Sequence, residues 1–81
     1  MKFLIEWKIK PKYRRDANKA LEKFEQPKEV KTVFAGHYCV GASRGIAVVE
    51  ADDAIVIHKT LSQMMDYTNF KVTPILPMFP E

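Results

Sequence analysis

The pattern of apolar and polar positions divides the first third of the chain into two segments with different periods. From Lys2 to Lys10, apolar residues occupy every second position, which is typical of a strand with one buried face. After Pro11 the apolar residues recur at helical spacing until Pro27, which predicts a helix. The members of this helical stripe are Tyr13, Ala17, Ala20, Leu21 and Phe24. The chain therefore opens with a strand and a surface helix.

Two further strands, a helix and a last strand follow. Residues 30–40 and 46–51 are rich in β-branched and aromatic residues, and the segment GASRG between them predicts a hairpin or a bulged turn. Asp52 and Asp53 are suitable N-caps for a second helix, whose stripe comprises Ala54, Ile57, Leu61, Met64 and Met65. Residues 70–76 form the last strand. Pro74 inside it predicts an edge position, where no ladder N–H is missed.

The predicted order is β-α-β-β-α-β, the split βαβ arrangement of ferredoxin-like folds. We therefore expect an α+β fold in which a four-stranded antiparallel sheet carries two helices on one face. The length of 81 residues predicts a single domain over residues 1–81. Within it, the proline-rich residues 74–81 are expected to form an extended C-terminal arm that lies on a partner subunit.

Two helices cover only one face of such a sheet, and the opposite face still carries Leu4. Depending on the strand register, it also carries Phe34, Tyr38, Val40, Ala47, Val49 and Ile75. Such an apolar surface is not left in water, and pairing with a second copy is the usual solution. We expect a homodimer formed through the open sheet face and the C-terminal arm.

The cysteine and histidine residues indicate the cellular compartment of the protein and whether it holds a metal centre. Cys39 has no partner in the chain for a disulfide, and a lone thiol fits a reducing compartment, so we expect a cytoplasmic protein. We expect no metal centre, since Cys39, His37 and His58 lack paired ligand spacing. The opening segment has an apolar run of only three residues before Glu6, which predicts neither a signal peptide nor a membrane span.

Two motif-like segments argue against nucleotides and nucleic acids. GASRGI at 41–46 resembles the start of a dinucleotide-binding loop, but such a loop precedes a helix and here the strand-like IAVVE follows. We therefore expect no cofactor. Residues 44–51 match an RNA-recognition signature at its basic, glycine, small and valine positions but lack all three stacking aromatics. The net charge of +3 is also weak for a nucleic-acid partner.

The candidate site residues are Trp7, His37, Tyr38 and His58. Trp7 lies on a strand that is central in this topology, where an indole can wall a small apolar pocket. His37 on the sheet and His58 on a covering helix can converge on a cleft, where an imidazole can act as an acid, a base or a ligand contact. We take these two as candidate catalytic residues and all four as candidate ligand contacts. Structural roles for the histidines stay open, and a bulge near Gly41 or Gly45 would reverse which side His37 occupies relative to the next strand.

Three segments, FLIEWKIKP, VVEADDA and FKVTPIL, resemble a bacterial family, domain-of-unknown-function family 3303, placed in the dimeric α/β barrel group. The resemblance spans essentially the whole chain. It implies a dimer whose two sheets face each other as a barrel, with a cleft between each sheet and its helices. The family tends to carry a Trp-His pair around the positions of His37 and Tyr38, so the histidine is displaced by one here.

Two functions stay open at this point. Relatives in the wider group include cofactor-independent monooxygenases, haem-degrading enzymes and lactone isomerases, so the fold does not decide an activity. The leading hypothesis is that the protein binds a small, partly apolar ligand in the sheet-helix cleft. A more specific version is that it is a cofactor-independent oxygenase or isomerase acting on that ligand. The alternative is a non-enzymatic module for self-assembly or protein interaction. A cavity of roughly a few hundred Å³ would favour the first and a filled interior the second.

Overall fold

Strand β1 (Lys2–Ile9) lies inside the sheet, between β3 (Arg44–Glu50) and β4 (Thr68–Ile75). Strand β2 (Lys31–Tyr38) extends the sheet beyond β3, which gives the order β2-β3-β1-β4 with antiparallel neighbours throughout. The strand β4 therefore lies at an edge, as Pro74 within it predicted.

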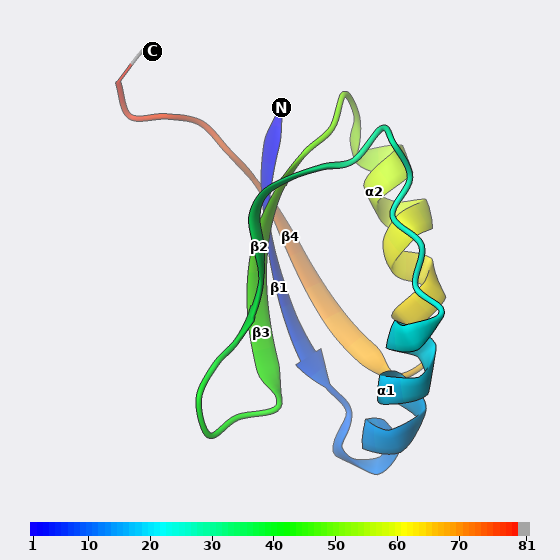
Figure 1. Cartoon of the computed structure of the whole chain (residues 1–81). Helices are drawn as coiled ribbons and strands as arrows, with labels where there is room; N and C mark the ends of the chain where they lie inside the picture. Colours follow the sequence, from blue (N-terminus) through cyan, green and yellow to red (C-terminus); the bar gives the residue numbers. More distant parts are fainter. Residues whose placement is uncertain (80–81) are drawn as a thin grey trace.

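The computed structural model describes residues 1–79, and in it the two helices lie on the same side of the sheet (Figure 1). They are α1 (Arg14–Glu22) and α2 (Ala54–Leu61), each joined to a short 3₁₀ turn, η1 (Pro11–Tyr13) and η2 (Ser62–Met64). This arrangement confirms the predicted α+β, ferredoxin-like fold.

The helix ends agree only in part with the sequence pattern. Asp53 caps α2 as predicted, because its Oδ1 accepts a hydrogen bond from the Val56 N–H at 3.1 Å. Helix α1, however, ends at Glu22, well before Pro27. The residues between them run alongside the other helix as an irregular segment (Figure 1).

The core lies between the sheet and the helices. Its buried residues come from β1, β3, α2 and the residues directly before β2 and after β3: Phe3, Ile5, Val30, Val49, Ala51, Ile57 and Leu61. Trp7, Val56, Met65, Phe70 and Val72 pack against this cluster and are half-buried. Apolar burial is therefore concentrated on the helix-facing side of the sheet.

The register decides which side chains face the helices. Val49 is the partner of Phe3 and Ala47 is the partner of Ile5, so both share the face of the buried core. Tyr38 is the partner of Gly45 on that same face. The open-face positions considered for Tyr38, Ala47 and Val49 are therefore wrong, because a residue and its cross-strand partner point to the same side.

The open face of the sheet carries a cluster of apolar side chains. Leu4 is the partner of Val48, and Val48 is the partner of Phe34, so these three cross the sheet in a row. Ile46 and Ile75 share this face by strand alternation. We call Leu4, Phe34, Ile46, Val48 and Ile75 the open-face cluster. The remaining considered position, Val40, lies beyond the end of β2 and is fully exposed.

The hairpin between β2 and β3 is confirmed, and it contains two irregularities. The pairing shifts between Thr32 and Phe34 and again between Phe34 and His37. Because each bulge changes the side on which the next residue points, Phe34 and His37 face the same way although they are three residues apart, and their rings stack at 4.4 Å. In the connecting loop Gly41 has a φ of 77°, the left-handed region that favours glycine.

The indole of Trp7 lies against two glycines on neighbouring strands. A Cβ atom built on Gly45 would overlap the Trp7 atoms Cζ2 and Cε2, and one built on Gly36 would lie 3.2 Å from Cη2. The absence of side chains at these two positions lets the indole rest on the backbone of β3 and β2. One aromatic side chain from β1 thereby contacts both strands on that side of the sheet.

Beyond Ile75 the chain leaves the sheet. Leu76, Met78 and Phe79 are 82%, 90% and 77% exposed, and the segment bends toward the side of the sheet opposite the helices (Figure 1). Of the arm predicted for residues 74–81, the first two residues belong to β4, and residues 80–81 lie outside the described residues. Within residues 1–79, none of the helices combines the length and apolarity needed to cross a membrane.

Replacing Gly45 with alanine places a Cβ atom where the Trp7 ring lies. Overpacking of this kind costs about 1–3 kcal/mol, so we expect Gly45→Ala to lower the free energy of unfolding by about that amount. Urea unfolding followed by circular dichroism measures the change. Gly36→Ala is the matched control, because its Cβ would only approach the ring edge and the loss should be smaller. Equal losses in both variants would contradict this placement of the indole.

Candidate functional site

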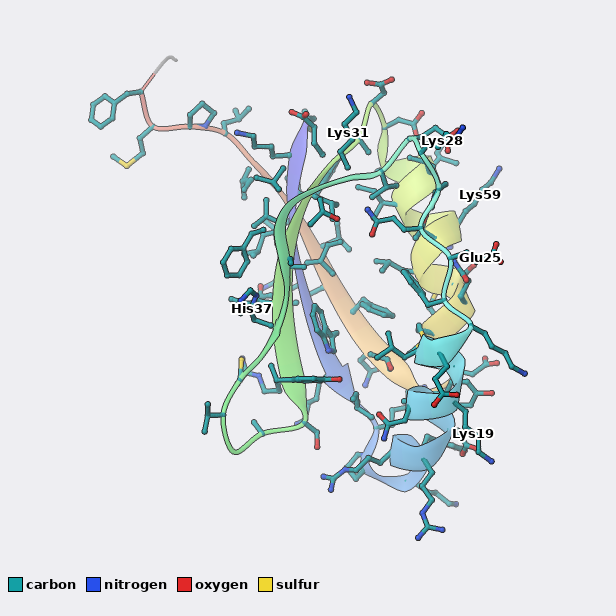
Figure 2. The ribbon with its side chains drawn as sticks, viewed as in Figure 1. Lys19, Glu25, Lys28, Lys31, His37 and Lys59 are labelled. Atoms are coloured by element: carbon teal, nitrogen blue, oxygen red, sulfur yellow. The ribbon has the colours of Figure 1, made fainter. Side chains whose placement is uncertain are left out.

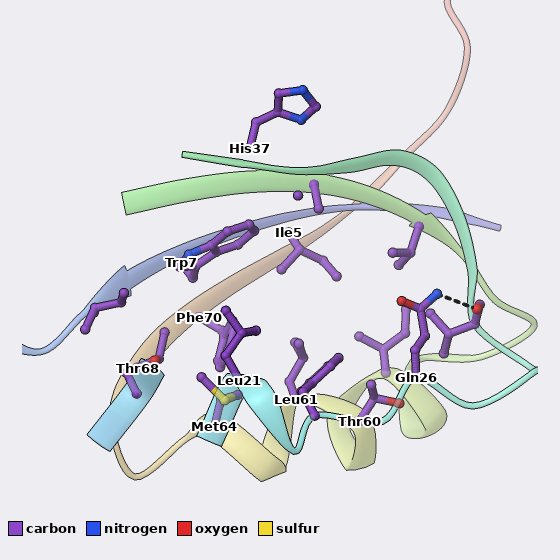
Figure 3. A pocket seen from close by; sticks show the side chains of 18 of the residues that line it. Ile5, Trp7, Leu21, Gln26, His37, Thr60, Leu61, Met64, Thr68 and Phe70 are labelled. Carbon is purple, nitrogen blue, oxygen red and sulfur yellow. Dashed lines mark hydrogen bonds between the residues drawn. The ribbon is translucent and has the colours of Figure 1, made fainter. Parts of the chain in front are cut away.

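A pocket of about 350 Å³ lies between the sheet and the helix layer (Figure 3). The sheet wall comprises Ile5, Trp7, Ile9, Gly36, Tyr38, Ala47, Val49, Thr68 and Phe70. The opposite wall comprises Ala17, Asn18, Leu21, Phe24, Gln26, Val30, Ile57, Thr60, Leu61 and Met64. Most of these side chains are apolar, and among the described residues no Asp, Glu, Lys or Arg lines the pocket.

Small residues leave the pocket unfilled. Gly36 and Ala47 stand on the sheet wall and Ala17 faces them from α1, at positions where larger side chains would occupy the space. The larger side chains around them then lack packing partners on one side and forfeit dispersion contacts. A molecule that fills the pocket would restore those contacts.

Trp7 and Tyr38, two of the four residues singled out in the sequence, both line the pocket. Trp7 is half-buried and packs against the core, so its indole forms an inner part of the wall. Tyr38 is 66% exposed, which places it at the rim. These two aromatic side chains are close in the sheet because Tyr38 and Trp7 are both partners of Gly45.

The imidazole of His37 points away from the pocket. His37 borders the pocket, but its ring projects from the other side of the sheet, as Figures 2 and 3 show. There it stacks on Phe34, and its Nδ1 is within hydrogen-bond distance of the Ala35 carbonyl oxygen. The sheet face that the sequence left undecided for His37 is thus the open face, beside the open-face cluster.

His58 is exposed on α2 and does not line the pocket. The residues of α2 that face inward are Ile57, Thr60 and Leu61, which occupy one side of the helix. The two histidines therefore lie on different sides of the molecule and do not converge on the pocket. Charged side chains such as Lys59 and Lys19 also point outward from the helix layer (Figure 2).

Three of the polar side chains in the walls differ in their hydrogen bonding. Gln26 donates from Nε2 to the Val30 carbonyl oxygen at 2.8 Å and to Thr32 Oγ1 at 3.0 Å. Thr60 donates to the Val56 carbonyl oxygen within its helix at 2.7 Å. Thr68 is buried and its Oγ1 has no hydrogen-bond partner among the described residues. Thr68 and Gln26 lie at opposite ends of the pocket (Figure 3).

Thr68, Gln26 and Leu21 line the pocket but are not among the site residues predicted from the sequence. Leu21 belongs to the predicted helical stripe, so its inward position was visible, although its place in a pocket wall was not. Thr68 precedes the predicted last strand by two residues, and extending the alternation of Phe70 and Val72 backwards would have put it on the same face. Gln26 carries no such signal, because it lies in an irregular segment.

Gln63 holds the outer wall in place. Its Oε1 accepts a hydrogen bond from the Glu25 N–H at 3.0 Å, and its Nε2 donates to the Glu25 carbonyl oxygen at 2.8 Å and to the Thr60 carbonyl oxygen at 3.0 Å. One side-chain amide thereby joins the segment after α1 to the C-terminal end of α2. The irregular segment that carries Phe24 and Gln26 is anchored to the helix layer by these contacts.

The chain matches the family model described as Domain of unknown function (DUF3303) over residues 1–78. The protein belongs to this family. The resemblance noted in its three segments is therefore confirmed. No curated protein matches the chain. The DUF3303 description specifies no activity, so the chemistry of this DUF3303 protein has to be argued from its pocket.

The positions of the histidines generate a prediction for this DUF3303 protein. Because neither imidazole faces the pocket, His37→Ala and His58→Ala should leave the affinity for a pocket ligand unchanged within about twofold. Nuclear magnetic resonance titration with 2-naphthol as a probe measures the affinity of each variant. Trp7→Ala is the comparison variant, since it removes a wall and should weaken binding. A large loss of affinity in either variant would contradict this prediction and would show that the histidine contacts the ligand, as the sequence indicated.

Proposed function

We propose that this protein binds a small, partly apolar molecule in the pocket between its sheet and its helices, and that it does so as a cytoplasmic homodimer. The observation that carries the proposal is the pocket itself. Its volume of about 350 Å³ falls in the usual range of small-molecule sites, about 300–1,000 Å³. Its walls combine apolar side chains with a few polar atoms, which is the usual composition of such sites.

Trp7 and Tyr38 are the proposed aromatic walls for the ligand. An indole and a phenol offer large rigid surfaces to an apolar molecule, and each keeps one polar group for a hydrogen bond. Because Trp7 lies inside the pocket and Tyr38 lies at its rim, an entering ligand would pass Tyr38 and then contact Trp7. The mainly apolar surroundings favour a ligand that gains most of its affinity from burial.

A reaction of the cofactor-independent oxygenase or isomerase type is not included in the proposal. General acid-base catalysis most often relies on a histidine within hydrogen-bond reach of the bound molecule. His37 turns its ring to the open face of the sheet, and His58 lies exposed on α2 outside the pocket walls. We therefore propose binding as the function of the pocket.

Two features support the homodimer. The open-face cluster places five apolar side chains on the face that the helices leave uncovered, and Phe34 among them is 43% exposed. The exposed apolar residues after Ile75 bend toward that same side (Figure 1). A second copy facing this side would bury both surfaces at once by a symmetric contact. The pocket lies on the other side of the sheet and would stay accessible.

The second candidate function is a module for self-assembly or protein interaction. The observation that favours it is the exposure of Leu76, Met78 and Phe79 at the C-terminal end, since exposed apolar side chains in a row mark contact surfaces. The two functions differ in one respect that can be measured. A pure interaction module would leave the pocket without a ligand.

Native mass spectrometry of the protein purified from its own cells should show a dimer with additional mass. Ala47 lines the pocket, so Ala47→Leu should fill part of it and give a dimer without the additional mass. Ala42→Leu, in the exposed loop between β2 and β3, is the matched control and should keep the ligand. A bare dimer of the unmodified protein would favour the interaction module.

Truncation after Ile75 tests the role of the C-terminal segment. The truncation leaves β4 complete and removes the exposed apolar residues. We therefore expect the dissociation constant of the dimer to rise at least about tenfold. Light scattering at a series of protein concentrations measures the equilibrium. The full-length double variant Leu76→Ser, Phe79→Ser should behave in the same way, because it removes the same apolar surface. An unchanged dimer in both cases would exclude the segment from the interface.

A further inference from the structure

Thr68, a residue of the pocket wall, carries a buried polar atom without a hydrogen-bond partner among residues 1–79. It is the first residue of β4 and the partner of Ile9, and its side chain is only 3% exposed. Among the buried side-chain oxygen and nitrogen atoms of residues 1–79, Thr68 Oγ1 is the one that lacks a hydrogen-bond partner. A buried hydroxyl without a partner loses the hydrogen bonds it would make in water, so a partner supplied from outside would be favourable.

Two other polar side chains of the walls already form hydrogen bonds within the protein. The hydroxyl of Thr60 already donates within its helix, and the amide of Gln26 already donates to the backbone and to Thr32. The ring of His37 points away from the pocket. Thr68 is therefore the wall residue, among residues 1–79, whose fully buried polar atom still lacks a hydrogen bond.

The charge of the walls limits the ligand further. Within the described residues, no carboxylate, ammonium or guanidinium group lines the pocket. A charged ligand would lose its hydration there without gaining a counter-charge, which is strongly unfavourable in an apolar environment. The ligand that fits this pocket is neutral.

We infer that the ligand is a neutral, mainly apolar molecule with one hydroxyl or carbonyl group, and that this group forms a hydrogen bond with Thr68 Oγ1. The inference rests on the proposed binding function and specifies its ligand class. A threonine hydroxyl can both donate and accept, so it can pair with either group. Thr68 is thus a specificity-determining residue, and the aromatic and aliphatic walls supply the remaining affinity.

A cycle of matched changes in protein and probe tests the inference. The probes are 2-naphthol and 2-methylnaphthalene, which differ by a hydroxyl in place of a methyl group, and Thr68→Val makes the same change in the protein. The ratio of the two dissociation constants is measured by nuclear magnetic resonance titration of the ¹⁵N-labelled protein. We expect the preference for 2-naphthol over 2-methylnaphthalene to fall by about 3- to 10-fold in Thr68→Val, the range of one hydrogen bond.

Two variants serve as controls. Thr60→Val also removes a hydroxyl from the pocket wall, but that hydroxyl is already paired, so the ratio should stay as in the unmodified protein. Thr68→Ser keeps the hydroxyl and should retain the preference. If Thr68→Val fails to fold, contacts between the Thr68 methyl protons and the ring protons beside the naphthol hydroxyl, observed in the unmodified protein, take its place.

The outcomes separate the two proposals. If both probes bind and the ratio is the same in Thr68→Val, or if the naphthol hydroxyl lies far from Thr68, the assignment of Thr68 is wrong while the binding function stands. If neither probe binds the unmodified protein, the binding function fails together with the ligand class. A fall in the ratio confined to Thr68→Val supports both.

Discussion

The contact between the Trp7 indole and the backbone at Gly36 and Gly45 is the constraint on which much of the structure depends. An indole on the helix-facing side of β1 needs room over its neighbouring strands, and the two glycines supply that room. The same contact makes the ring part of the pocket wall instead of leaving it free to fill the space between sheet and helices. Packing of the sheet and shape of the pocket are therefore coupled through one side chain.

Much of the fold could be predicted from the sequence because burial on one side leaves a regular pattern. The alternation in β1, the hairpin at Gly41 and the Asp53 cap were all visible in the residue order. The faces of β2 were not, since two bulges interrupt its alternation and bring Phe34 and His37 to the same side. A bulge depends on how two strands pair, and the sequence of one strand does not record it.

The site was predictable where a residue's position followed from the topology. Trp7 lies on a central strand and lines the pocket for that reason, whereas His58 lies one residue after the buried Ile57 and turns to solvent. Thr68 illustrates a different limit. Its significance lies in a hydrogen bond that its hydroxyl does not make within residues 1–79, and a missing partner becomes visible only when every neighbour has been placed.

The position of Trp7 has an optical consequence. It is the single tryptophan of the chain, and its ring stands in the wall of the pocket. The emission of an indole shifts to shorter wavelength when water around it is replaced by apolar groups, so the intrinsic fluorescence of this protein reports the hydration of one place. Entry of a molecule into the pocket can thus be followed in the unlabelled protein, without a signal from any other tryptophan.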